Sequence, residues 1–280
     1  MDSLVSTGWL AEHLGDPDLV ILDATKHLAA SGRDAGAEFL AAHIPGARFL
    51  NLGDFADPAS PIGKTLPGPT RAAIRVSSLG IVPGSRVVLY DDSDVKTSAR
   101  AWFILRGYGI RPVAILDGGL AKWRAEGRRL ERGKAKGTKS EFAPADFAGP
   151  VRRKTDMLAN LGSGIEQVID ARDEARFTGA AKDMVHDLPG GHIPGARNLF
   201  FRDLYNADGT FKSEADLRSA FERAGVDLAR PIVTSCGSGV TASVLLFALH
   251  RLGIDDAALY DGSWSEWGAD PDTPKATGPA

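Results

Sequence analysis

Short apolar runs alternate with amphipathic segments along most of the chain. Apolar runs predict short buried strands at residues 19–23, 86–90, 113–116, 167–170, 232–234 and 257–260. Segments with apolar residues every three to four positions predict helices at residues 33–42, 70–79, 97–106, 120–126, 155–161, 214–224 and 240–252. Because strands alternate with helices, we expect an α/β protein whose mainly parallel sheets are flanked by helices.

The chain also contains an internal repeat. The six residues His-Ile-Pro-Gly-Ala-Arg occur at 43–48 and again at 192–197, which is 149 positions later. Trp123 and Trp267 follow similar Asp-Gly turns and lie 144 positions apart. Ordered matches at nearly constant spacing indicate a tandem duplication of a unit of ordinary domain size.

The repeat divides the chain into two domains. We expect one domain at residues 1–130 and a second at residues 151–280, both on the same α/β plan. Residues 131–150 are rich in Lys, Gly, Ser and Pro and are expected to form a linker, and residues 57–69 a surface loop. The tail at residues 270–280 is expected to be flexible.

Composition and charge disfavour several classes of protein. The 280 residues are 43% hydrophobic and 25% charged, as in an ordinary soluble globular protein. A net charge of −3 without a basic block argues against a nucleic-acid partner, and no apolar run is long enough for a membrane span. The N-terminus lacks the pattern of a secretory signal. A single cysteine excludes an internal disulfide and a zinc site made of cysteines, so we expect no metal and a reducing, cytoplasmic location.

The strongest candidate for chemistry is Cys236, the only cysteine of the chain. It follows the apolar run at 232–234 and precedes the small residues Gly237, Ser238 and Gly239, after which a helix is predicted. Loop amides and the positive end of that helix would both favour the thiolate, which is the nucleophilic form of cysteine. A lone cysteine is often only a small buried residue, but the glycines and the serine favour a catalytic role.

The two copies of the repeat differ at this loop. At the offset of 144, Asp92 stands opposite Cys236. A carboxylate cannot perform the chemistry of a thiolate, so we expect the second domain to be catalytic and the first to lack a nucleophile. The site is expected at the carboxyl edge of the strands.

A tandem α/β repeat with His-Ile-Pro-Gly-Ala in each half, and a cysteine loop in the second half only, resembles the two-domain rhodanese family of sulfurtransferases. The loop Cys-Gly-Ser-Gly-Val-Thr at 236–241 is similar to that of members that use 3-mercaptopyruvate. Members that prefer thiosulfate carry two basic residues where this chain has Gly237 and Ser238. The resemblance covers nearly the whole chain and implies two tandem rhodanese-like domains that need no cofactor.

The resemblance implies a sulfur transfer in two steps. The Cys236 thiolate takes sulfur from 3-mercaptopyruvate, pyruvate leaves, and the cysteine persulfide passes its outer sulfur to a thiol or to cyanide. Backbone amides from Gly237, through Gly239 and Val240, to Thr241 would surround the persulfide anion. A thioredoxin-like dithiol protein would be a suitable acceptor.

The resemblance also implies roles for side chains. Ser238 would relay a proton or orient the substrate, together with Asp34 and His43 of the first domain. Because His192 has the same local sequence as His43, a purely structural role in the turn stays open for that histidine. Arg176 would hold the anionic donor through paired hydrogen bonds.

One position departs from the pattern of the mercaptopyruvate enzymes. They carry a second substrate arginine nine residues after the first, where this chain has Val185, with Lys182 and His186 as possible replacements. A thiosulfate-preferring sulfurtransferase and a non-catalytic persulfide carrier or binding module therefore remain alternatives. A cysteine phosphatase is disfavoured, because such enzymes need an arginine six residues after the cysteine, where this chain has Ala242.

Overall fold

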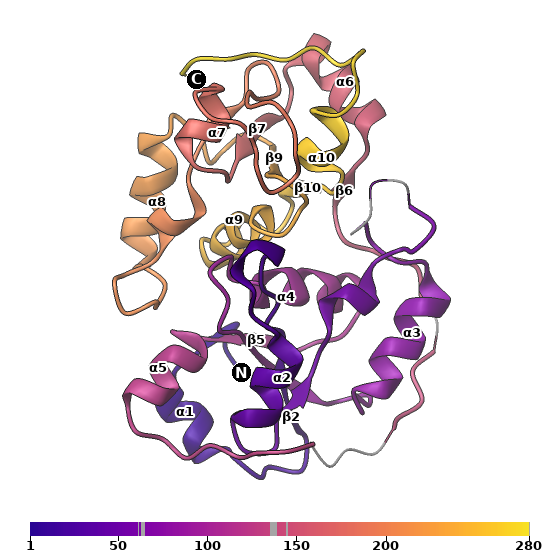
Figure 1. The fold of residues 1–280 in the computed structure, drawn as a ribbon, viewed down its shortest axis with the longest axis vertical. Helices are drawn as coiled ribbons and strands as arrows, with labels where there is room; N and C mark the ends of the chain where they lie inside the picture. The colour runs from indigo at the N-terminus through magenta and orange to yellow at the C-terminus, as the bar shows by residue number, and fades with distance from the viewer. Residues whose placement is uncertain (61, 63–64, 135–138, 144, 280) are drawn as a thin grey trace. The chain divides into compact units, whose positions relative to one another are not determined.

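The computed structural model describes the whole chain except residues 61, 63–64, 135–138, 144 and 280. The chain forms two compact units (Figure 1). Unit 1 comprises Met1–Ala59, Leu66–Gly149 and Ala207–Phe211, and unit 2 comprises Ser60–Thr65, Pro150–Asn206 and Lys212–Ala280. The predicted surface loop at 57–69 and the predicted linker at 131–150 lie partly outside the described residues.

Unit 1 is built on a five-stranded sheet in the order β1-β5-β4-β2-β3, and every pairing is parallel. Its central strand β4 carries consecutive side chains that are fully shielded from solvent on both faces, as the apolar run predicts. The strands are β1 Leu4–Val5, β2 Leu19–Asp23, β3 Arg48–Phe49, β4 Arg86–Tyr90 and β5 Val113–Leu116. The helices are α1 Thr7–Glu12, α2 Ala35–Ala41, α3 Pro69–Ser78, α4 Ser98–Gly107 and α5 Gly119–Ala125, with 3₁₀ turns at Ala29–Ser31 and Leu52–Phe55.

Unit 2 repeats this plan. Its parallel sheet has the order β6-β10-β9-β7-β8, which is the order of unit 1 strand for strand. The strands are β6 Val151–Arg152, β7 Gln167–Asp170, β8 Arg197–Asn198, β9 Ile232–Ser235 and β10 Ala258–Tyr260. The helices are α6 Lys154–Ser163, α7 Glu174–Thr178, α8 Glu214–Arg223, α9 Ala242–Arg251 and α10 Ser263–Trp267, with a 3₁₀ turn at Phe201–Leu204. The identical topology confirms the internal duplication and the α/β class.

Most elements lie where the apolar pattern predicts them. The strands β2, β4, β5 and β7 match the predicted residues, and the seven helices predicted above begin and end within two residues of expectation. The edge strands β1, β6 and β8 and the short helix α7 were not predicted. Two-residue strands and a five-residue helix are too short to show a period, so only neighbouring elements determine them.

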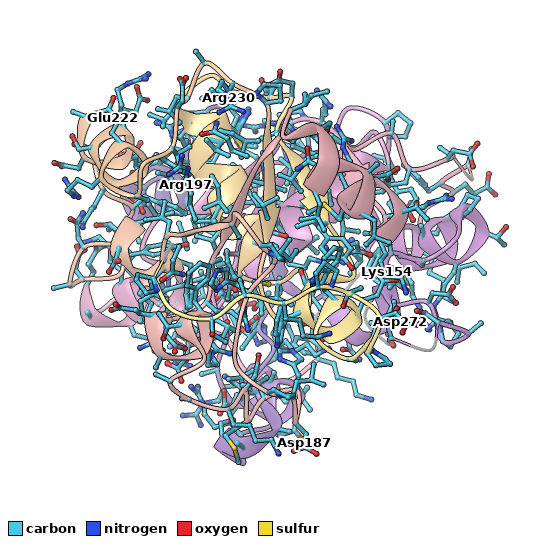
Figure 2. All side chains as sticks on the ribbon, turned by 90° about the horizontal axis from the view of Figure 1, so that it is seen from above. Lys154, Asp187, Arg197, Glu222, Arg230 and Asp272 are labelled. Carbon is cyan, nitrogen blue, oxygen red and sulfur yellow. The ribbon has the colours of Figure 1, made fainter. Side chains whose placement is uncertain are left out.

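The prediction of a flexible C-terminal tail is wrong. The segment, yellow in Figure 1, pairs with the His192 turn through Ala276 and with the end of α7 through the Gly278 amide. Lys154 Nζ donates a hydrogen bond to Asp270 Oδ2 at 2.5 Å, and Asp272 lies beside this pair (Figure 2). The tail is polar in sequence, but it supplies backbone partners that the turn would otherwise lack.

Candidate active site

Cys236 lies between the end of β9 and the start of α9, as the sequence predicts. The residue is 1% exposed, and α9 behind it is buried along almost its whole length. The carbonyl groups of Cys236 and Gly237 accept hydrogen bonds from the amides of Trp264 and Ser265, at 3.0 and 2.8 Å. The cysteine loop is therefore fixed against the first turn of α10.

Ser263 is a part of the site that the sequence did not reveal. Its Oγ accepts hydrogen bonds from the amides of Cys236 and Gly239, at 3.1 and 3.2 Å, and donates one to the carbonyl of Tyr260 at 2.9 Å. Ser263 is fully buried and has a φ of 48°, which costs a residue with a Cβ about 1 kcal/mol. The contact spans 27 residues of sequence, so no local pattern could indicate it.

The rest of the loop leaves its donors unused. The amides of Gly237, Ser238, Val240 and Thr241 donate to no residue in the described part of the chain. Gly239 has a φ of 75°, a conformation in which glycine is favoured, and this bend turns the chain into α9. Several free amides beside a buried thiol form a place where a sulfur anion can be stabilised.

The position that corresponds to Cys236 in unit 1 is Asp91, not Asp92. In the sheets, Tyr90 pairs with Asp23 as Ser235 pairs with Asp170, so the next residues, Asp91 and Cys236, are equivalent. The amide of Leu120 donates to the carbonyl of Asp91, as that of Trp264 does to Cys236. The constant offset failed because the unit 1 loop, residues 91–97, is one residue longer than the unit 2 loop, residues 236–241.

The unit 1 loop is filled by its own side chain. The Asp91 carboxylate accepts hydrogen bonds from the Ser93 amide and hydroxyl, at 2.9 and 3.0 Å, and from the Ser98 amide at 2.9 Å. Asp92 instead forms ion pairs at 3.1 Å with Arg33 and Arg124. Unit 1 therefore holds an anion of its own where unit 2 presents a thiol.

Arg176 lies on α7 within a group of charged residues of unit 2. Its Nε donates to Asp173 Oδ2 at 2.6 Å, and its Nη1 lies 3.5 Å from Oδ1 of the fully buried Asp183. The Arg176 side chain is 22% exposed, so a ligand can reach it. Arg172, in contrast, is fully buried and donates to Asp170 and to the Gly191 carbonyl, both at 2.6 Å.

Asp34 and His43 belong to unit 1 and lie at opposite ends of α2. The exposed Asp34 caps the helix by accepting a hydrogen bond from the Ala37 amide at 3.0 Å. His43 is buried, its Nδ1 bonds the Phe39 carbonyl at 2.8 Å, and its ring stacks on that of Phe39. The two residues therefore do not form an Asp–His pair with each other.

The second histidine of the repeat has the same surroundings as the first. His192 Nδ1 bonds the Phe177 carbonyl at 2.9 Å, and the two rings stack at 3.9 Å. A contact that is present in both copies supports the structural reading of the histidine turn. The Ser238 side chain, for which a proton relay was predicted, makes no hydrogen bond within the described residues of the chain.

Two features are absent from the residues that the structure describes. Among them, no group of three or more His, Cys, Asp or Glu side chains is placed to bind a metal ion. None of their helices is long and apolar enough to cross a membrane.

The chain is similar to known proteins over nearly its full length. A family model described as a rhodanese-like domain matches residues 6–126 and 154–270. The 3-mercaptopyruvate sulfurtransferase of Escherichia coli is 39% identical over 273 residues, which cover 96% of each chain. The human 3-mercaptopyruvate sulfurtransferase and the bovine thiosulfate sulfurtransferase are each 37% identical, covering 95% of this chain and 91% of theirs.

The fold agrees with these relationships. The crystal structure of SseA from Escherichia coli, described as a 3-mercaptopyruvate sulfotransferase with the rhodanese fold, superposes with a TM-score of 0.86 at 37% identity. The match covers 94% of this chain and 99% of that one. The chain belongs to the rhodanese family, with two tandem rhodanese-like domains. The human mercaptopyruvate enzyme and the bovine thiosulfate enzyme are both 37% identical to this chain, so identity to these two relatives does not distinguish the donors.

Proposed function

We propose that this chain is a sulfurtransferase that moves sulfane sulfur from 3-mercaptopyruvate to a thiol or to cyanide through a persulfide on Cys236. The observation that carries the proposal is the lone cysteine in a loop whose amides at Gly237, Ser238, Val240 and Thr241 have no other described partner. A persulfide carries negative charge close to neutral pH, and these donors suit it.

In the first step, the Cys236 thiolate attacks the sulfur of the donor. A new S–S bond forms, the C–S bond of the donor breaks, and its electron pair leaves on pyruvate as the enolate, which then takes up a proton. In the second step, an acceptor thiolate or cyanide attacks the outer sulfur and restores the Cys236 thiolate. A thioredoxin-like dithiol in the cytoplasm is the proposed physiological acceptor.

The residues around the loop have proposed roles in this reaction. Arg176, whose side chain is 22% exposed, is suited to bind the carboxylate of the donor through its guanidinium. The Ser238 hydroxyl, which makes no hydrogen bond within the described residues, is suited to orient the donor or pass a proton, with Asp34 and His43 as its proposed partners. We assign residues 1–130 to a domain without a nucleophile, residues 131–150 to a linker and residues 151–280 to the catalytic domain.

Thiosulfate is the second candidate donor. Its supporting observation is the 37% identity to a thiosulfate sulfurtransferase, whereas the small residues Gly237 and Ser238 favour the larger mercaptopyruvate. A persulfide carrier without turnover is the remaining alternative.

The test is steady-state sulfur transfer to cyanide, with kcat/KM compared for the two donors and with Cys236→Ser as the control. We expect a clear preference for mercaptopyruvate and no turnover by the variant. A preference for thiosulfate would overturn the assignment of the donor. The intact mass of the protein after incubation with donor alone distinguishes an enzyme from a persulfide carrier. A gain of one sulfur atom in a protein that shows no turnover would leave only the carrier function.

A further inference from the structure

The segment that follows α7 brings a histidine to the cysteine loop. Asp183 and Leu188 pair through two backbone hydrogen bonds, and the residues between them form a turn. Within the turn, Met184 and Val185 are 77% and 44% exposed, whereas the His186 side chain is only 9% exposed. The turn therefore directs His186, and not Val185, into unit 2.

The His186 ring packs directly on Gly237. A Cβ added to Gly237 would lie 2.1 Å from Cε1 and 2.9 Å from Nε2 of the ring, closer than real atoms approach. Any other residue directly after Cys236 would therefore displace the imidazole. Because Gly237 has no side chain, the His186 ring can lie against the residue that directly follows Cys236.

The Asp183 carboxylate holds the ring in place. Its Oδ1 accepts hydrogen bonds from His186 Nδ1 and from the Val185 amide, both at 3.1 Å. Burial raises the pKa of Asp183, but the His186 hydrogen bond and the positive charges of Arg176 and Arg172 outweigh burial and lower that pKa to about 2. The carboxylate is therefore ionised, and it orients the ring by accepting the hydrogen bond of Nδ1–H.

The other ring nitrogen has no partner. His186 Nε2 is shielded from solvent and makes no hydrogen bond within the described residues. A buried polar atom without a partner costs free energy, and in a native protein it calls for an explanation. Beside a nucleophilic loop, with an anion already bound to the opposite nitrogen, the explanation is a ligand that accepts a hydrogen bond.

We propose that His186 is an anion-binding residue of the donor site. In the complex its ring carries both protons, one donated from Nδ1 to Asp183 and the other from Nε2 to the carboxylate of a 2-oxo acid donor, while Cys236 attacks the sulfur. The proposal rests on the proposed function for the identity of the donor. Arg176 lies on α7 and, like His186, contacts the Asp183 carboxylate. From this position its guanidinium is suited to bind the carboxylate of the same donor. Lys182 does not fit this role, because it pairs with Asp187 at 2.5 Å, and Asp187 points outward at the edge of the ribbon in Figure 2.

Alkylation of Cys236 tests this proposal without turnover. The chain has one cysteine, so the rate constants for iodoacetate and iodoacetamide both report on that thiol. Their ratio cancels any change in thiolate content and measures the attraction for a carboxylate beside the sulfur. We expect the iodoacetate-to-iodoacetamide ratio to fall roughly tenfold in His186→Ala and less in His186→Gln, which keeps a neutral donor.

Matched variants keep the test sharp. Lys182→Ala removes a cation from the same turn and Met184→Ala an exposed side chain, and both should leave the ratio unchanged. Gly237→Ala should lower the ratio by displacing the ring, even if His186→Ala folds poorly. An unchanged ratio in both His186 variants would overturn the proposal. So would an equal fall with both reagents, which would make the histidine a base for the thiol, or an effect of Lys182→Ala as large as that of His186→Ala.

Steady-state kinetics then separate this proposal from the proposed function. The His186→Ala variant should show a KM for mercaptopyruvate raised roughly tenfold and a nearly unchanged kcat. If the unmodified protein turns over neither donor, the proposed function fails, but the alkylation ratio still reports on His186. If the protein turns over mercaptopyruvate and His186→Ala does so with the same KM, only the role of His186 fails.

Discussion

The loops that follow β4 and β9 share one strand–loop–helix frame but differ in what satisfies their amides. In unit 1, the Asp91 carboxylate binds the amides of Ser93 and Ser98. In unit 2, the residue at the same position is Cys236, and most loop amides have no partner in the described structure. The duplicated frame is thus able to bind an anion in both units, and only unit 2 leaves that capacity free for a reacting sulfur.

The largest effect is expected when Cys236 is replaced by aspartate, the residue found at the equivalent position of unit 1. Cys236→Asp should abolish sulfur transfer, a loss of at least about 10³-fold, because no nucleophile remains. Its thermal unfolding temperature should nevertheless be no lower than that of Cys236→Ala, since the free amides can bind the carboxylate. An unfolding temperature of Cys236→Asp well below that of Cys236→Ala would contradict the comparison between the two loops.

The reverse change removes the anion of unit 1. Asp91→Ala leaves two buried amides and the Ser93 hydroxyl without their acceptor, and should lower the free energy of unfolding by about 4 kcal/mol. Asp91→Asn keeps one acceptor oxygen, so its free energy of unfolding should fall by about half as much as that of Asp91→Ala. Urea unfolding followed by circular dichroism measures both, and equal stability of Asp91→Ala and the unmodified protein would show that the carboxylate has no such role.

A third contrast concerns the carboxylates of Asp23 and Asp170, the last residues of the equivalent strands β2 and β7. Asp170 pairs with buried Arg172, whereas the donors beside the counterpart Asp23, among the described residues, are Thr25 and Tyr90. Burial raises the pKa of Asp23 to about 6, although the hydrogen bonds of Thr25 oppose this shift. The folded state therefore binds the proton more tightly than the unfolded state, and stability falls as pH rises from about 4 to about 6.

Asp23→Asn should remove this cost of ionisation. At pH 7 the gain in stability is no more than about 3 kcal/mol, and at pH 4 it should nearly vanish. Unfolding temperatures of variant and unmodified protein, compared at the two pH values, give the answer. A difference that does not depend on pH would mean that Asp23 titrates normally.

The smallest effect is expected at Ser263, whose counterpart in unit 1 is Gly119. Both have positive φ, but a Cβ on Gly119 would lie 2.5 Å from the Asp91 carbonyl oxygen. Ser263→Ala should lose about 1 to 2 kcal/mol through the unpaired amides of Cys236 and Gly239, and kcat should fall roughly tenfold as the loop shifts.

Ser263→Gly separates the strain of this residue from its hydrogen bonds. It loses the same acceptor but is relieved of the unfavourable φ, so it should be more stable than Ser263→Ala by about 1 kcal/mol. Equal stabilities of the two variants would show that the backbone at residue 263 stores no strain.

The sequence by itself determined the α/β class, the duplication, the central strands and the place of the candidate nucleophile between a strand and a helix. These features depend on local patterns: apolar runs form buried strands, and a cysteine before glycines at a helix start has few other uses. The folding of residues 19–23 into β2 and 86–90 into β4 is a consequence of their own side chains.

Only the tertiary structure decided which residues complete the site. The register of the two sheets showed that Asp91 is the counterpart of Cys236. The sequence alignment pointed to Asp92 instead, because the unit 1 loop has one extra residue. The contacts of Ser263 with Cys236, and of His186 with Gly237, join residues far apart in the chain. Such contacts depend on how turns and strands meet in space, and the local pattern of apolar and polar residues carries no record of that arrangement.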